Sequence, residues 1–214
     1  MIDDALASTV CSWMKYVHAT MAKNIVAMGY PNGGKDAAPA ERNISIPLAA
    51  KLLGEGYVVY AEPTRSSDSS KERIDLIAAN NDFAFAIEMK RRTKNFEGAL
   101  SDVRRILQFE VQVAPSATSD LACTSAFATA KRRFGLFVST NFEEQTGFAD
   151  QWRELPKGLT LVDKYKYLPE VLKTLPQGAR FDCTDADTST QVFARTGAFR
   201  LYWILFSVCD AAAE

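Results

Sequence analysis

The stretch from Arg73 to Arg91 constrains the fold of this chain more than any other. Two segments rich in β-forming residues flank Asn80-Asn81-Asp82, a sequence well suited to a tight turn. Successive side chains of a strand point to opposite faces, so each segment presents two distinct faces. The pattern predicts a β-hairpin with strands over residues 73–79 and 83–91.

Helices and further strands are predicted on both sides of this hairpin. Apolar residues at steps of three or four indicate helices over 4–28 and 96–110. A helix that ends near Leu53 begins either near Pro39, with a kink at Pro47, or near Ser45, because proline is best tolerated in a first turn. Strands are predicted over 57–62, 134–140, 159–162 and 199–208, and a short helix over 168–175.

This order predicts an α/β (α+β) protein with a mixed central β-sheet flanked by helices. A chain of 214 residues is expected to form a single domain over 1–214. Within it we expect an N-terminal helix and loop over 1–35, a core over 38–140, and a C-terminal extension over 141–214 that packs on the core.

Composition narrows the class of protein. No apolar run is long enough to span a bilayer, and Asp3 and Asp4 open the chain where a secretory signal would be basic. The four cysteines are far apart and His18 is the only histidine, which argues against a zinc site and against a disulfide framework. We therefore expect a cytoplasmic protein without a membrane partner.

Charged residues follow small ones on one face of the second hairpin strand. Ala84, Ala86, Glu88 and Lys90 share this face, and the turn places Asp75 opposite Glu88 or close to it, with Cβ atoms about 5 Å apart. Two such carboxylates repel each other and are costly to desolvate, and a hard divalent cation relieves both problems. Lys90 reaches the same site, where it could orient an attacking water and offset negative charge in the transition state.

The alternative interpretation is an exposed ion pair among Asp75, Glu88 and Lys90, worth about 0–1 kcal/mol. Ala84 and Ala86 favour the first interpretation, because small side chains suit a covered face.

The spacing of these residues resembles the D…(D/E)xK signature of the PD-(D/E)xK, or restriction-endonuclease-like, nuclease superfamily. Asp75 is followed by twelve residues and then by Glu88-Met89-Lys90. The flanks are similar too: residues 73–77 read RIDLI and residues 86–90 read AIEMK. The predicted element order over about residues 40–140 matches the αβββαβ core of that superfamily, although Ile74 stands where its name has proline.

The resemblance implies a nuclease that depends on Mg²⁺, with Mn²⁺ as a substitute, and hydrolyses phosphodiester bonds in DNA, with RNA as an alternative substrate. Asp75, Glu88 and the Met89 carbonyl would bind the metal, and Lys90 would be the catalytic lysine. A further glutamate often comes from the first core helix, for which Glu41 is the candidate and Glu62 the alternative.

Basic residues near this site are candidates for phosphate contacts: Arg91, Arg92, Lys94, Arg104 and Arg105. The net charge of −1 argues mildly against a broad nucleic-acid-binding surface. Restriction, phage defence and mobile-element processing are all open as roles. The alternative function is a non-catalytic nucleic-acid-binding or scaffold subunit that keeps the nuclease fold, and a homodimer or a partner subunit could complete the surface.

Overall fold

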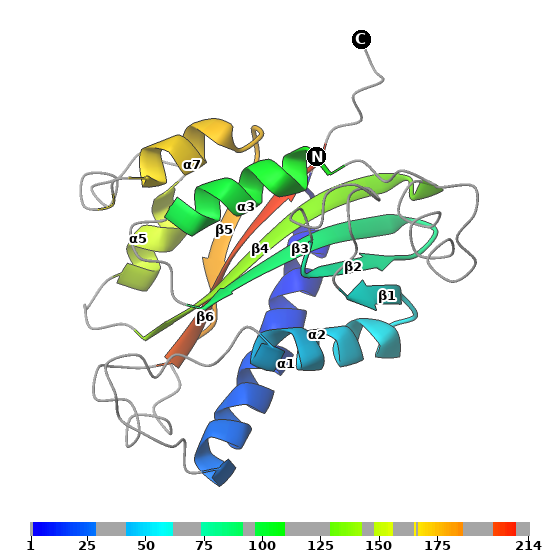
Figure 1. The fold of residues 1–214 in the computed structure, drawn as a ribbon, viewed down its shortest axis with the longest axis vertical. Coiled ribbons are helices and arrows are strands. Elements are labelled where there is room, and N and C mark those ends of the chain that lie inside the picture. Colours follow the sequence, from blue (N-terminus) through cyan, green and yellow to red (C-terminus); the bar gives the residue numbers. More distant parts are fainter. Residues whose placement is uncertain are drawn as a thin grey trace, which may run out of the picture.

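The computed structural model describes residues 2–28, 42–61, 74–91, 97–109, 129–142, 148–155, 165, 167–185 and 199–208. Within these residues a mixed β-sheet lies between two layers of helices (Figure 1). The elements, in chain order, are α1 (Asp4–Met28), α2 (Arg42–Gly54), β1 (Val58–Ala61), β2 (Leu76–Ala79), β3 (Phe83–Arg91), α3 (Glu97–Leu107), β4 (Arg132–Phe142), α5 (Phe148–Glu154), α7 (Leu168–Thr174), β5 (Arg180–Cys183) and β6 (Phe199–Ser207). The mixed α/β class predicted from the sequence is confirmed.

The six strands are ordered β1-β2-β3-β4-β6-β5 across the sheet. β3 and β4 run parallel, while every other neighbouring pair is antiparallel. A parallel pair needs a long crossover connection, and α3 lies within the one between β3 and β4. β6, which comes last in the chain, pairs with β4 in the interior of the sheet. The C-terminal region thus contributes two strands, β5 and β6, to the sheet as well as packing against it.

The predicted β2–β3 hairpin is confirmed, with its turn at Asn80. The Asn80 amide donates to the Phe83 carbonyl at 2.9 Å. The Asn80 side-chain oxygen accepts hydrogen bonds from the backbone amides of Asp82 at 3.0 Å and Phe83 at 2.8 Å. An asparagine side chain that bonds to the following backbone in this way fixes a tight turn. The turn sets the register, in which Leu76 pairs with Ile87.

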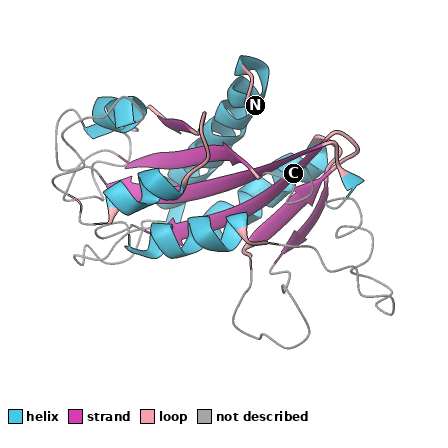
Figure 2. Cartoon of the chain, turned by 90° about the horizontal axis from the view of Figure 1, so that it is seen from above, coloured by secondary structure: helices cyan, strands magenta, loops and turns pink. Residues whose placement is uncertain are grey.

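Each face of the sheet has its own apolar core, and Figure 2 shows helices on both sides of the strands. On one face, α1 and α2 cover side chains such as Phe85 and Ile87, with the Trp13 ring 5.1 Å from that of Phe85. On the other face, α3 covers the small residues Ala84 and Ala86, while α5 and α7 pack against β5 and α3 and complete the same core. The alternation of β3 predicted from the sequence therefore separates the two cores.

Helix α3 approaches the sheet closely because the strands beneath it carry very small residues. A Cβ atom at Gly135 of β4 would lie 2.3 Å from ring atoms of Phe206 and 2.6 Å from a methyl carbon of Ile106 on α3. Gly135 pairs with Ala86, which is also small and fully buried. The glycine thus leaves the space in which α3 packs over the end of the hairpin.

The structure differs from the sequence predictions in several elements. α2 runs from Arg42 with Pro47 inside it, so the helix begins at neither of the two expected points. Proline there removes one helical hydrogen bond, and the affected carbonyl belongs to Asn43, an exposed residue. β2 begins at Leu76 rather than at residue 73, and α5 and β5 were not predicted. The strand predicted over 159–162 lies outside the described residues.

Across the described parts of the chain, none of the helices combines the length and apolar character that crossing a bilayer requires.

Candidate functional site

The hairpin register brings Asp75 and Glu88 to the same place. Leu76 pairs with Ile87, so one step further along the two strands sets Asp75 opposite Glu88. The Asp75 carboxylate accepts a hydrogen bond of 2.6 Å from the backbone amide of Met89. This bond ties Asp75 to β3 immediately after Glu88, at the point where the β2 ladder has ended. The two carboxylates therefore belong to one local arrangement, as the alternation of the strands predicted.

Glu88 is a carboxylate in the interior of the protein. Only 1% of its surface is exposed, and α3 covers the sheet face on which it lies. Arg105 of α3 donates from Nη1 to Glu88 Oε1 at 2.7 Å. An exposed surface pair, the alternative interpretation of this motif, is therefore wrong for Glu88.

A third acidic residue, Asp102 of α3, lies in the same cluster and was missed by the sequence analysis. It is 1% exposed, and its Oδ1 atom lies 3.2 Å from Arg105 Nη1. Its Oδ2 atom lies 3.3 Å from Lys90 Nζ but in a geometry that makes no hydrogen bond, and no other group bonds to it. The signal was present in the sequence, because Asp102 shares the buried stripe of α3 with Ala99, Val103 and Ile106.

Lys90 and Arg105 lie at the edge of the cluster, where solvent reaches them. Their side chains are 30% and 26% exposed, respectively, while the carboxylates they contact are buried. The Lys90 stem runs beside the first turn of α3, with its Cε atom 3.7 Å from the position that a Cβ at Gly98 would take. The cations thus lie between buried acidic groups and water.

The charges within this cluster do not balance. Among the residues that the structure describes, the carboxylates of Asp75, Glu88 and Asp102 outnumber the cations of Lys90 and Arg105 by one. Burial raises the pKa of Glu88 to about 8, the charges of Asp75 and Asp102 add to this, and Arg105 opposes it. Burial also raises the pKa of Asp102, against the positive charges of Lys90 and Arg105. The surplus negative charge can be removed by a proton on Glu88 or by an added cation.

The raised pKa of Glu88 predicts how stability depends on pH. The ordinary value is 4.5 and the folded value about 8, so the folded protein binds the extra proton in this window. The stabilisation that this bound proton provides is fully present below pH 4.5 and is lost as pH rises to 8. Across this range the free energy of unfolding falls by up to about 1.4 kcal/mol per pH unit.

Urea unfolding in EDTA at pH 5, 6.5 and 8 measures this dependence. We expect the free energy of unfolding to fall across the series in the wild type, and to change less in Glu88→Gln, which keeps the shape of the side chain but has no proton to lose. Equal slopes in the two proteins would contradict the assignment to Glu88.

The other candidate residues are placed as follows. Arg104 is exposed on α3, while Arg105 turns toward the carboxylates. The backbone of Arg91 ends β3. The positions predicted for further metal or phosphate contacts lie outside the described residues: Glu41, Glu62, Arg92, Lys94 and the Arg91 side chain. Among the residues that are described, no three carboxylate, thiol or imidazole groups converge closely enough to hold a metal as they stand.

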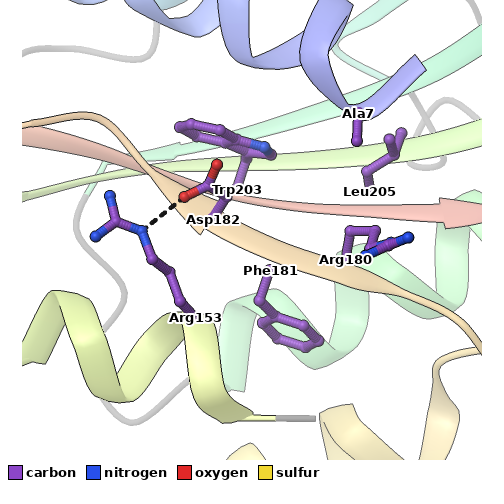
Figure 3. A pocket seen from close by; sticks show the side chains of 7 residues that line it. All are labelled: Ala7, Arg153, Arg180, Phe181, Asp182, Trp203 and Leu205. Atoms are coloured by element: carbon purple, nitrogen blue, oxygen red, sulfur yellow. Dashed lines mark hydrogen bonds and ion pairs between the residues drawn. The ribbon is translucent and has the colours of Figure 1, made fainter. Parts of the chain in front are cut away.

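A pocket of about 300 Å³ lies elsewhere, where the edge strand β5 meets α1 and α5 (Figure 3). Arg153 reaches from α5 to Asp182 on β5 at 2.8 Å. Arg180 contacts Asp4 at 3.1 Å. Each arginine of the pocket therefore already has a carboxylate partner. The pocket has little surplus positive charge with which to hold a phosphate, and we do not assign the nucleic-acid site to it.

Comparison with protein-family models, curated proteins and solved structures finds no significant match to this chain.

Proposed function

We propose that this protein is a Mg²⁺-dependent nuclease that hydrolyses phosphodiester bonds in DNA and resembles the PD-(D/E)xK superfamily, with an αβββαβ core over about residues 40–140. One observation carries the proposal: Asp75 and Glu88 meet at the end of the β2–β3 hairpin, with Lys90 two residues further on and α3 covering the site. Restriction, phage defence and mobile-element processing would each use this chemistry.

The donor atoms at the site suit a hard divalent cation. Mg²⁺ prefers carboxylate and carbonyl oxygens and keeps several waters. Asp75 and Glu88 would hold it, together with the Met89 carbonyl. Asp102 Oδ2, which is buried without a hydrogen bond and has an ion-pair contact with Lys90 at 3.3 Å, is a further carboxylate oxygen at the site. The surplus negative charge of the cluster also favours the binding of a cation. When bound, Mg²⁺ supplies Lewis-acid polarisation of a phosphoryl oxygen and a more acidic water.

The chain's own residues have separable roles in this proposal. The Lys90 ammonium, partly open to solvent, would orient the attacking water and offset negative charge that develops on the phosphate. Arg104, exposed on α3, is a candidate to contact the nucleic-acid backbone. α3 excludes water from the inner side of the cluster, which strengthens the electrostatic interactions there.

A non-catalytic nucleic-acid-binding or scaffold subunit is the second candidate. The observation that favours it is the ion pairing of Arg105 with Glu88 and Asp102, which offsets part of the charge of the buried carboxylates without any metal. Such a subunit would bind nucleic acid in a salt-dependent manner and leave it intact.

Incubation of the purified protein with linear, supercoiled and single-stranded DNA and with RNA separates the two candidates. We expect cleavage of DNA with Mg²⁺ or Mn²⁺, none with EDTA, and at least a hundredfold lower rate in Asp75→Asn, because one metal ligand is lost. Asp82→Asn is the matched control, since Asp82 is an exposed aspartate paired with Lys131. Salt-sensitive binding without cleavage at high protein concentration would instead establish the scaffold function.

A further inference from the structure

A single nitrogen atom of Arg105 bridges the two most deeply buried carboxylates of the cluster. Nη1 lies 2.7 Å from Glu88 Oε1 on β3 and 3.2 Å from Asp102 Oδ1 on α3. Both carboxylates are 1% exposed, so neither can obtain full hydration in place of this contact. The nitrogen thus lies between two carboxylate oxygens, in the position that a metal ion bound to both would occupy.

The contact leaves the site incompletely satisfied. Asp102 Oδ2 is buried without a hydrogen bond, and Lys90 contacts it only as an ion pair at 3.3 Å. When all the described groups of the cluster are ionised, their carboxylates exceed their cations by one. Arg105 contributes one positive charge, whereas a divalent cation contributes two and attracts both carboxylates more strongly. With 26% of its side chain exposed, Arg105 has a route to water when it leaves Glu88.

We propose that Arg105 is an internal competitor of the divalent cation: its guanidinium bridges Glu88 and Asp102 in the ion-free protein, and the cation binds by taking its place. Asp102 then becomes the third carboxylate of the metal site, a role for which the sequence analysis considered Glu41 and Glu62. This inference depends on the metal site of the proposed function. In the ion-free protein, no three carboxylates among the described residues converge as a metal site would require, and the Arg105 nitrogen lies between two of those that would form it.

Mn²⁺ binding, followed by the loss of the free-ion signal in electron paramagnetic resonance, tests the proposal without any substrate. We expect Arg105→Gln to bind Mn²⁺ roughly ten- to hundredfold more tightly than the wild type, since one charge-assisted hydrogen bond no longer competes. Arg104→Gln is the control, because Arg104 is the exposed neighbour on the same helix. An affinity in Arg105→Gln equal to or weaker than that of the wild type would overturn the proposal.

Asp102→Asn tests the second half of the inference. Loss of one anionic ligand is expected to weaken Mn²⁺ binding at least tenfold, while Asp82→Asn leaves it unchanged. Wild-type affinity in Asp102→Asn would remove Asp102 from the site. The Mn²⁺ affinity could depend on Asp75 and Glu88 but be unchanged by substitution of Arg105 or Asp102. In that case this inference fails and the proposed nuclease site stands. If neither the wild type nor any variant binds Mn²⁺, both fail.

A measurement on the unmodified side chain covers the case in which Arg105→Gln does not fold. In protein with ¹⁵N-labelled arginine, the Nε–H resonance of Arg105, assigned with Arg105→Lys, is expected to shift when Mg²⁺ is added. The Arg153 resonance serves as the reference, because its ion pair with Asp182 lies at the edge strand β5, which β4 and β6 separate from the strand of Glu88. An unchanged Arg105 resonance at saturating Mg²⁺ would show that the arginine stays in place.

Discussion

Lys90→Met is expected to lower the rate of DNA cleavage by roughly 10²–10³-fold, the magnitude found when one group that stabilises transition-state charge is removed. The Michaelis constant for DNA is expected to change little. Methionine keeps the length and the apolar stem of lysine, so the packing beside Gly98 is retained. The ammonium matters most in the transition state, because negative charge on the phosphate grows there.

Two further variants make the Lys90 experiment specific. Lys90→Arg keeps a positive charge but replaces a compact ammonium by a planar group, and we expect it to recover only part of the rate. Lys131→Met is the control, because Lys131 is an exposed lysine paired with Asp82. Single-turnover cleavage measures the chemical step. A wild-type rate in Lys90→Met, in protein whose folding is verified by circular dichroism, would exclude Lys90 from catalysis.

Gly135→Ala is expected to lower the free energy of unfolding by about 2–3 kcal/mol, the upper part of the usual range for overpacking a well-packed core. The added methyl group would lie 2.3 Å from the Phe206 ring and 2.6 Å from Ile106. Both of those side chains are fully buried, so neither can move aside cheaply. The strain must therefore push α3 away from the sheet and separate Asp102 and Arg105 from Glu88.

Urea denaturation measures this loss, with Gly54→Ala as the matched control. Nothing lies within 4 Å of the position that a Cβ at Gly54 would take, and alanine favours a helix over glycine. We expect Gly54→Ala to be neutral or slightly stabilising. Equal midpoints for Gly135→Ala and the wild type would mean that α3 does not depend on the glycine for its close approach.

Local patterns in the sequence were sufficient to predict the hairpin that carries the site. The Asn80 turn and the alternation of small and large residues on β3 define the register, and they place Glu88 opposite Asp75 without further information. The helix with Pro47 was harder to predict, because tertiary packing overrides the local cost of an internal proline. The short elements α5 and β5 have few residues from which a period could be recognised.

The cross-chain contacts of the site could not be predicted in the same way. Asp102 and Arg105 reach Glu88 only because α3 folds back over the sheet, a tertiary contact that no spacing in the sequence specifies. Arg105 was expected to face nucleic acid, yet in the structure it pairs with Glu88 and Asp102. The sequence did contain one indication of this contact, because Asp102 is a charged residue on the otherwise apolar, buried stripe of α3.

Anomalous X-ray scattering from a crystal soaked in Mn²⁺ locates a bound ion relative to the carboxylates. If Asp75 and Glu88 form a metal site, a peak is expected in contact with both carboxylates, beside Lys90, and it disappears in Asp75→Asn. A fully soaked crystal with no peak at these two carboxylates, or with Mn²⁺ bound only elsewhere on the protein, would contradict this expectation.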